Sequence, residues 1–289
     1  MKRQRLVAGL RLNYLEAGEG ETLLLLHGTA IDSAQLSYGG CLEHLAQNYH
    51  VIAPDWPGYG ESEYPVKSLE LDDYTDLLST FIHDLALDKL HLVGFSMGGA
   101  IALNYALNVS SVRSLTLVSS YGLSGRVHVP LLPYLMLRVP RLARSLWSGL
   151  RFSKPLLSLV LRYAIFAKPD RVSPELIDEV YAQLKKPMVE RAFMNWIRGQ
   201  IGILGLKSHY QRELHRLKVP TLLLHGARDL VIPAAYARRA ASYLPHAQLS
   251  IVPDCGHWLL REKRDHFLKD LEAFLATLTA QLEEKPEGG

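Results

Sequence analysis

Several features that mark particular classes of protein are missing from this sequence of 289 residues. No apolar run approaches the roughly 20 residues that a membrane-spanning helix requires. The apolar stretch Leu6-Val7-Ala8 behind the basic N-terminus stops at Gly9 and is too short for the core of a signal peptide. Only two cysteines, Cys41 and Cys255, are present, so no disulfide framework is expected.

An excess of one charge is missing as well. The net charge of +3 is small and no recognition motif accompanies it, so we expect no nucleic-acid partner. Apolar residues at 48% and charged residues at 21% describe an ordinary globular chain, long enough for one large domain with an inserted subdomain. Together these observations predict a cytoplasmic globular protein.

Short apolar runs alternate with helical patterns over the first part of the chain, up to residue 121. Two short strands that turn at Gly9 precede the run Thr22–Leu26 and the further run Val51–Ala53. Runs of this length between turn residues are typical of parallel strands that are covered on both faces. Residues 71–87 carry a helical stripe of apolar side chains. This alternation predicts a doubly wound α/β sheet with right-handed crossovers.

The alternation stops between residues 122 and 216, where helical patterns are broken by prolines and no buried strand is recognisable. The strand pattern resumes at Val219–Leu224. We therefore expect residues 1–121 and 217–289 to form the core of the protein. Residues 122–216 are expected to form a helical cap over the carboxyl ends of the strands.

The first half of the expected cap is strongly basic. Between residues 122 and 171 a single acid, Asp170, stands against nine basic residues: Arg126, Arg138, Arg141, Arg144, Arg151, Lys154, Arg162, Lys168 and Arg171. The simplest interpretation is a solvated basic face around an apolar lining. The alternative is attraction to an anionic substrate, an acidic carrier protein or a membrane surface.

A serine between glycines lies at the junction of an apolar run and a helical pattern, in Gly94-Phe95-Ser96-Met97-Gly98. Such a turn holds the serine in strained dihedrals, and a Cβ on either glycine would clash with the neighbouring strand or helix. The hydroxyl is thereby exposed at the carboxyl end of the sheet, near the positive end of the helix dipole. The pattern predicts that Ser96 is a nucleophile.

With the pattern G-x-S-x-G in this setting, the chain resembles the α/β-hydrolase family. The loop Asp55–Ser62 also matches the D-x-x-G-x-G-x-S pattern of that family. The resemblance implies a mostly parallel, eight-stranded, doubly wound sheet with an inserted helical cap. It also implies a serine, an acid and a histidine in that order along the chain, with no cofactor and no metal. Here Ser96, Asp229 and His257 follow this order.

Other residues compete for two of these roles. His27 and His225 each precede a glycine at a strand end. The first corresponds to a structural feature of the family, and the second is too close to Asp229 along the chain to be its easy partner. Asp254 is the rival acid, but it lies only three residues before His257. We therefore assign the acid to Asp229 and the base to His257.

An oxyanion hole needs two backbone N–H groups that are aimed at the developing negative charge. One is expected from Met97, the residue after the nucleophile. The resemblance to the His-Gly-x loops of the family assigns the other to Thr29, with Ala30 as the alternative. We also expect five residues to contribute to the substrate pocket: Ala30, Tyr121, Trp196, Ile232 and Trp258.

A serine nucleophile argues against epoxide hydrolases and haloalkane dehalogenases, which look similar but carry aspartate at this position. Capped carboxylesterases look more similar, and so do the carbon–carbon bond hydrolases of aromatic degradation, at Ser96–Gly99 and Cys255–Trp258. The carbon–carbon hydrolases usually carry asparagine where this chain has Phe95. The resemblance therefore favours the carboxylesterases.

We expect the protein to hydrolyse carboxylic esters through an acyl-enzyme intermediate. The apolar lining expected for the cap indicates a small-molecule substrate with an apolar acyl or aryl group. The alternatives on the same site are carbon–carbon hydrolysis of a vinylogous diketone, lactone hydrolysis and perhydrolysis. Outside the enzymes, the alternative is a ligand receptor built on a hydrolase scaffold.

Overall fold

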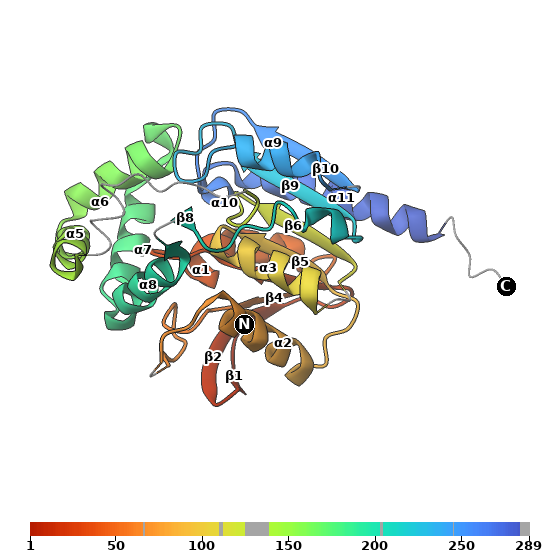
Figure 1. The fold of residues 1–289 in the computed structure, drawn as a ribbon, viewed down its shortest axis with the longest axis horizontal. Coiled ribbons are helices and arrows are strands. Elements are labelled where there is room, and N and C mark those ends of the chain that lie inside the picture. The colour runs from red at the N-terminus through yellow and green to blue at the C-terminus, as the bar shows by residue number, and fades with distance from the viewer. Residues whose placement is uncertain (66, 110–111, 125–138, 203–204, 245, 284–289) are drawn as a thin grey trace.

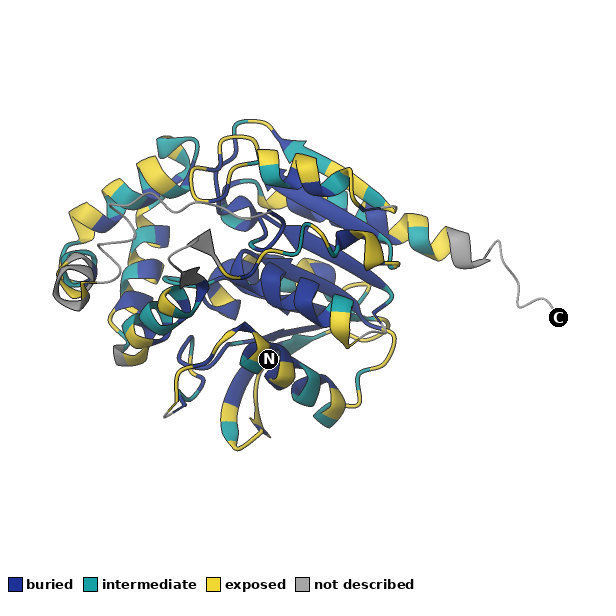
Figure 2. Ribbon diagram, viewed as in Figure 1, coloured by how far each residue is buried: buried dark blue, intermediate teal, exposed yellow. Residues whose placement is uncertain are grey.

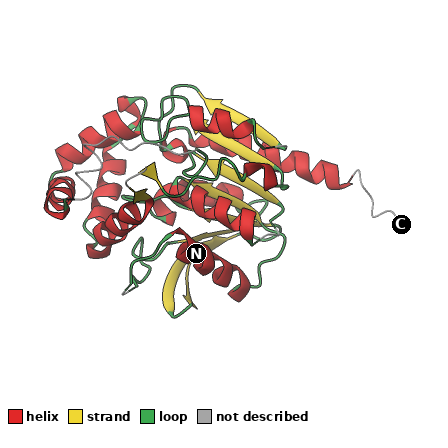
Figure 3. Cartoon of the chain, in the orientation of Figure 1, coloured by secondary structure: helices red, strands yellow, loops and turns green. Residues whose placement is uncertain are grey.

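The computed structural model describes residues 1–65, 67–109, 112–124, 139–202, 205–244 and 246–283. Its main element is an eight-stranded sheet in the order β1-β2-β4-β3-β5-β6-β9-β10 (Figure 1, Figure 3). The strands from β4 across to β10 run parallel, and β2 pairs antiparallel with β1 and β4. The predicted eight-stranded, mostly parallel sheet is confirmed. The strands are β1 (Lys2–Val7), β2 (Leu10–Ala17), β3 (Thr22–Leu26), β4 (His50–Pro54), β5 (His91–Phe95), β6 (Ser114–Val118), β9 (Thr221–Gly226) and β10 (Ala247–Val252).

The central strands are buried because helices cover both faces of the sheet. Every residue of β5 and β6 is buried, and so are the leucines of β3. Helices α2 (Leu71–Asp84) and α3 (Met97–Asn108) pack together on one face, and α1 (Ala34–Leu45) and α11 (Arg264–Glu283) pack together on the other. Figure 2 shows the buried residues concentrated in the sheet and on the sides of the helices that face it. This layering agrees with the doubly wound sheet that the sequence predicts.

Between β6 and β9 the described chain forms helices at one end of the sheet, on the left in Figure 1. We refer to residues 139–202 and 205–216 as the cap. Its helices are α5 (Pro140–Phe152), α6 (Lys154–Val160), the π-helical turn η1 (Leu161–Ile165), the 3-10 turn η2 (Pro169–Arg171), α7 (Pro174–Leu184) and α8 (Pro187–Gln200). A short hairpin, β7 (Ile201–Gly202) and β8 (Gly205–Leu206), and the turn η3 (Leu214–Arg216) lead back to the core. The sequence gives no sign of this hairpin, because two residues per strand are too few to produce an alternating pattern.

The prolines that interrupt the helical patterns of the cap mark helix starts. They lie in the first turns of α5, α6, α7 and α8: Pro140, Pro155, Pro174 and Pro187. A proline is tolerated there because the N–H that it lacks would have no partner within the helix. The hydroxyls of Ser153 and Ser173 cap α6 and α7 by accepting hydrogen bonds from backbone N–H groups.

Two further expectations concern the charge and the membrane. Arg126 and Arg138 of the basic segment lie outside the described residues. Across the described parts of the chain, no helix combines the length and the apolar character needed to cross a bilayer.

Candidate active site

Ser96 lies in the turn between β5 and α3, with φ 52° and ψ −112°. Residues other than glycine rarely adopt a positive φ, so this turn is strained. A Cβ on Gly94 would lie 2.4 Å from the carbonyl oxygen of Gly98, and a Cβ on Gly98 would lie 2.3 Å from that of Leu26. The close approach of strand and helix therefore requires glycine on both sides of the serine.

Three side chains form a hydrogen-bonded row at the carboxyl ends of the strands. Ser96 Oγ lies 3.1 Å from Nε2 of His257, and Nδ1 of His257 lies 2.8 Å from Oδ2 of Asp229. An ionised carboxylate accepts hydrogen bonds and donates none, so the proton of a neutral imidazole here is on Nδ1. Nε2 is then free to accept the proton of the serine hydroxyl. The structure thus brings together the three residues that the chain order selects.

Asp229 follows β9 in a turn that holds its carboxylate in place. Oδ1 accepts hydrogen bonds from the N–H groups of Val231 and Ile232, each at 2.8 Å. Burial by itself would raise the pKa of Asp229. The charge of His257 and the hydrogen bonds from His225 and His257 outweigh burial and hold that pKa well below its usual value. The carboxylate is therefore ionised at neutral pH and can stabilise a charged imidazole.

The two rivals near this row have other partners. Nε2 of His225 lies 3.2 Å from Oδ2 of Asp229, so this histidine helps to hold the acid. Asp254 lies nearer the surface, where its carboxylate is 3.1 Å from Arg228 and 3.6 Å from Lys168. Asp254 therefore belongs to a surface ion-pair cluster and not to the row.

The loop after β3 is held by two buried polar side chains. Nδ1 of His27 donates to the carbonyl oxygen of Gly28 at 2.8 Å, and Nε2 accepts from the N–H of Trp56 at 2.9 Å. The carboxylate of Asp32 accepts from the N–H groups of Gly28 at 2.7 Å and Ser33 at 2.8 Å. Burial lowers the pKa of His27 to about 3 and raises that of Asp32 to about 7. His27 is thus a neutral histidine whose two nitrogens are both used in holding the loop.

The expected oxyanion donors belong to the turn after Ser96 and to the loop after β3. Met97 is the first residue of α3, where backbone N–H groups have no partner within the helix. Thr29 and Ala30 line the same cavity as Ser96. The hydroxyl of Tyr59 lies 2.7 Å from that of Thr29. The assignment of the second donor to Thr29, with Ala30 as the alternative, stays a prediction.

A cavity of about 400 Å³ lies beside Ser96, between the loops of the core and the cap. Eight apolar side chains of the cap form one wall, among them Trp147, Leu157, Phe193 and Ile197. The polar side chains that reach the cavity come from the core: Thr29, Asp32, Ser96 and His257. No lysine or arginine occurs among the described residues that line it. The cavity thus combines a polar reacting edge with an apolar, uncharged wall.

Of the five residues expected in the pocket, Ala30 and Trp258 line this cavity. Tyr121, Trp196 and Ile232 are not among its described lining residues, which corrects that part of the expectation. The rings of Tyr121 and Trp196 pack edge to face with centroids 6.2 Å apart, and Trp196 also packs against α2. The backbone of Ile232 holds the acid of the row. These apolar residues therefore pack the cap and support the site without facing the cavity.

A comparison with protein families covers most of the chain. The family described as "alpha/beta hydrolase fold" matches residues 21–263. The chain belongs to the α/β-hydrolase family. It is 29% identical, over 93% of its length and 88% of the relative, to a 2-hydroxy-6-oxo-6-(2'-aminophenyl)hexa-2,4-dienoic acid hydrolase of Metapseudomonas resinovorans. It is also 29% identical, over 96% of its length and 95% of the relative, to a 2-hydroxymuconate semialdehyde hydrolase of Pseudomonas putida.

Solved structures of other α/β-hydrolases have the same architecture. A meta-cleavage product hydrolase of Pseudomonas fluorescens matches with a TM-score of 0.81 and 25% identity, over 95% of this chain and 97% of that one. A thermophilic esterase of Thermogutta terrifontis shares the fold, with a TM-score of 0.78 and 21% identity over 96% and 99% of the two chains. The fold is thus common to hydrolases of different bonds.

One residue of this α/β-hydrolase that the sequence did not single out joins the cap to the loop of His257. Glu262 ends the short helix α10 (Leu259–Glu262) and is buried. Its carboxylate accepts hydrogen bonds from the N–H groups of Gly256 at 2.7 Å, Ala167 at 3.0 Å and Lys168 at 2.9 Å. Nη1 of Arg171 lies 3.2 Å from the same carboxylate. We call these five residues the cap joint.

The cap joint lies beside the turn that carries His257. The N–H of His257 donates to the carbonyl oxygen of Ile165 at 2.8 Å, and a Cβ on Gly256 would lie 2.3 Å from that oxygen. The turn that carries His257 therefore packs directly against the backbone of the cap. Glu262 was missed because no motif or spacing connects it with residues 167–171, about ninety positions earlier in the chain.

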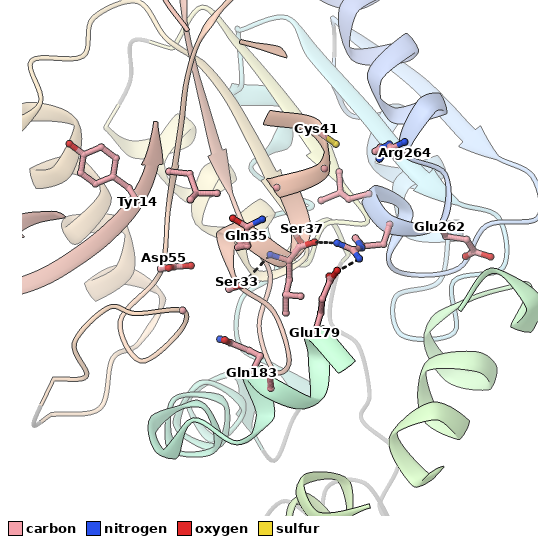
Figure 4. Close-up of a pocket in the computed structure, with 18 of the residues that line it drawn as sticks. Tyr14, Ser33, Gln35, Ser37, Cys41, Asp55, Glu179, Gln183, Glu262 and Arg264 are labelled. Atoms are coloured by element: carbon pink, nitrogen blue, oxygen red, sulfur yellow. Dashed lines mark hydrogen bonds and ion pairs between the residues drawn. The ribbon is translucent and has the colours of Figure 1, made fainter. Parts of the chain in front are cut away.

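A larger groove of about 1290 Å³ lies elsewhere along the junction of core and cap (Figure 4). Its walls are mainly polar and charged and come from α1, α7, α10 and α11. Arg261 joins core and cap there, donating to the carbonyl oxygen of Leu36 at 3.1 Å and to Glu179 at 2.8 Å. Neither Ser96 nor His257 lines this groove, so it is separate from the candidate active site.

Proposed function

We propose that this α/β-hydrolase cleaves carboxylic esters of small molecules with an apolar acyl or aryl group. The observation that carries the proposal is the cavity beside Ser96, whose cap wall is apolar and whose described lining contains no lysine or arginine. An uncharged substrate fits such walls. A carboxylate that left water for this cavity would lose its hydration without gaining a cationic partner, which is strongly unfavourable. The carboxyl of Asp32 on the wall would add repulsion whenever it is ionised.

In the proposed mechanism Ser96 Oγ attacks the ester carbonyl carbon while Nε2 of His257 takes the hydroxyl proton. Asp229 orients the imidazole and stabilises the imidazolium that forms. The N–H groups of Met97 and Thr29 stabilise the tetrahedral oxyanion. His257 then gives its proton to the leaving alcohol, and the acyl group stays on Ser96. A water molecule, deprotonated by His257, attacks the acyl carbon, and the acid leaves as the serine hydroxyl is restored.

Hydrolysis of a carbon–carbon bond is the second candidate, and the comparisons favour it over ester hydrolysis. The two relatives named above are, by their names, hydrolases of a dienoic acid and of hydroxymuconate semialdehyde, and they match at least 93% of this chain. The same row of serine, histidine and aspartate would hydrolyse the carbon–carbon bond of a vinylogous diketone. The two candidates differ in the charge of the substrate, since a dienoic acid brings a carboxylate into the cavity.

Two substrate series measured side by side separate the candidates. The first is a set of p-nitrophenyl esters of graded acyl length, and the second is a 2-hydroxy-6-oxo-hexadienoate. We expect sustained turnover of the esters, its loss in Ser96→Ala, and a kcat/KM for the dienoate at least about tenfold lower. A preference for the dienoate would establish the second candidate.

The same assay addresses the non-enzymatic alternative. A ligand receptor would release about one equivalent of nitrophenol per protein and then stop, whereas an acyl-enzyme that is hydrolysed gives a steady rate after any burst. Ester turnover that survives in Ser96→Ala, in protein shown to be folded, would contradict the mechanism.

A further inference from the structure

Helix α6 and the π-helical turn η1 that continues it have two different faces. Their inner side chains Leu157, Val160 and Ile165 line the cavity beside Ser96. Four apolar side chains at and beyond the end of α5 are exposed on the outside, with exposed fractions of 73% for Phe152, 39% for Leu156, 54% for Leu159 and 62% for Tyr163. Positions 156, 159 and 163 are spaced like one face of the helix formed by α6 and η1, and Phe152 is the last residue of α5, next to the extended Ser153 that separates the two helices. We call these four residues the outer stripe.

The outer stripe faces away from the body of the protein. In Figure 1, α5 and α6 form the outer margin of the cap, farther from the sheet than α7 and α8. Figure 2 shows exposed residues along this margin. Exposed apolar residues are usually scattered singly on a protein surface, and a cluster rimmed by polar residues marks an interaction surface. The outer stripe is therefore a candidate interaction surface.

Basic side chains lie beside one part of the outer stripe. Residues 139–171 include seven basic residues and one acid, Asp170, but Lys168 and Arg171 belong to the cap joint and Arg162 donates to the carbonyl oxygens of Pro169 and Val172. Arg144 and Lys154 are exposed, and the guanidinium carbon of Arg151 lies 5.7 Å from the centre of the Phe152 ring. The charge next to the stripe is thus positive.

The neighbouring helix α7 contributes three acids, and two of them are already paired. Asp178 pairs with Lys154, and Glu179 pairs with Arg261 of the core. The third acid is Glu175, in the first turn of α7. Counting these acids, residues 139–186 still hold nine basic residues against four acidic ones. The basic character of this part of the cap therefore persists.

We propose that the outer stripe docks on a lipid bilayer that contains anionic lipids. A helix with an apolar face, aromatic residues and a basic border is the arrangement that lies in the plane of a bilayer interface. Each lysine or arginine close to the surface adds attraction to anionic head groups. Pairing of two copies through this face would bring their basic borders together, because a two-fold interface matches a patch with itself. A lipid surface therefore fits the charge better than a second copy.

Docking by this face has a consequence for substrate access. The opposite side of the same helix lines the active-site cavity, so the cavity would lie one helix away from the lipid. Apolar esters concentrate in lipid, and a cavity in this position would receive them from there. The docking itself does not depend on which bond the protein cleaves.

Co-sedimentation of the full chain with vesicles tests the proposal. Two lipid compositions are compared, phosphatidylcholine alone and phosphatidylcholine mixed with phosphatidylglycerol. We expect the wild type to bind the anionic vesicles at least about tenfold more tightly than the neutral ones, with weaker binding as salt is added.

The double variant Phe152→Ser, Leu159→Ser is expected to lose at least about tenfold in affinity for the anionic vesicles. The matched control is Leu6→Ser, which removes a leucine that is 67% exposed on β1, outside the cap, and should bind like the wild type. Neither residue of the double variant lines the cavity, so turnover of a water-soluble ester should be unchanged and would show that the variant is folded.

Three results would overturn the proposal. The first is no binding of the wild type to anionic vesicles, and the second is equal binding by wild type and double variant. The third is a wild-type dimer that the double variant abolishes, because the outer stripe would then be an interface between copies. The vesicle measurement needs no catalysis, so it stands or fails independently of the proposed ester hydrolysis.

Discussion

The core and the cap both form the cavity beside Ser96, but they hold their residues in different ways. In the core, directed hydrogen bonds of 3.1 Å and 2.8 Å connect Ser96 with His257 and His257 with Asp229. In the cap, the wall consists of apolar side chains such as Leu157 and Ile197. Hydrogen bonds set both distance and angle, whereas apolar contacts are non-directional and set a volume. Changes in the core should therefore alter the rate of the chemistry, and changes in the cap should alter the choice of substrate.

The largest effect is expected from Asp229→Asn in the core. The amide would still reach Nδ1 of His257, but it would no longer hold the proton on that nitrogen or stabilise the imidazolium. We expect kcat to fall about 10⁴-fold while the fold is retained, measured by steady-state hydrolysis and circular dichroism. Asp254→Asn is the control, because that carboxylate pairs with Arg228 at the surface. A comparable loss in the control would assign the acid to Asp254.

A smaller effect is expected where the core and the cap meet, from Glu262→Gln. Glutamine keeps the volume, but an NH₂ group replaces one acceptor oxygen, so a buried N–H of the cap joint loses its acceptor and Arg171 loses its charge partner. We expect the free energy of unfolding, measured with urea, to fall by on the order of 3 kcal/mol. We also expect kcat to fall about tenfold, because the turn of His257 shifts.

Glu179→Gln is the matched control for the cap joint. Its carboxylate also pairs with an arginine between cap and core, Arg261, but about half of its side chain is exposed. Its replacement should change the free energy of unfolding by less than about 1 kcal/mol. Equal effects of the two changes would mean that the cap joint is no more than another surface ion pair.

In the cap, Ile197→Phe should change selectivity with little change in the chemistry. The larger ring fills part of the cavity, so kcat/KM should fall about 10–100-fold for the longest accepted acyl chain and stay nearly constant for the acetyl ester. The p-nitrophenyl series measures this directly. Met188→Phe serves as the control, because this exposed residue of the same helix does not line the cavity. A uniform fall in kcat for all esters would show that the cap acts on the chemistry as well.

The smallest effect is expected from Asp32→Asn, as a change in how stability depends on pH. Its pKa of about 7 in the folded protein lies above the value of about 3.9 in an unfolded chain, so the folded state binds this proton more tightly. The stabilisation is complete below about pH 4 and is lost as the pH rises through about 7. The Tm of Asp32→Asn relative to the wild type should therefore increase between about pH 5 and about pH 8, by the equivalent of on the order of 1 kcal/mol.

The pKa of Asp229 is shifted in the opposite direction to that of Asp32. Its pKa is held below the usual value in the folded protein, so its contribution to stability is present above the unfolded pKa and is lost only as the pH falls through the folded one. The carboxyl of Asp229 itself stays ionised between about pH 5 and about pH 8, so any trend in the relative Tm of Asp229→Asn in this range comes from its charged neighbours and not from its own titration. A relative Tm of Asp32→Asn that does not change between about pH 5 and about pH 8 would contradict the raised pKa of Asp32.

Much of the core could be predicted because its signals are local. The leucines of β3, the glycines around Ser96 and the residues Asp229 and His257 after strand ends each stand in short patterns with a steric or chemical reason. The cap was harder. Trp196 was expected in the pocket, but its ring packs edge to face with those of Tyr74 and Tyr121, and composition does not say whether a ring faces a cavity or another ring.

The sequence by itself determined the strands of the eight-stranded sheet and the strained serine turn, because neighbouring residues dictate backbone sterics. The resemblance to the α/β-hydrolases selected the three residues of the row by their order along the chain. The tertiary structure alone decided which apolar side chains line the cavity and which face outward as the outer stripe. It also decided that Glu262 would bind N–H groups of Ala167 and Lys168. Contacts between residues so far apart depend on how the cap is seated on the core, and no local pattern encodes that arrangement.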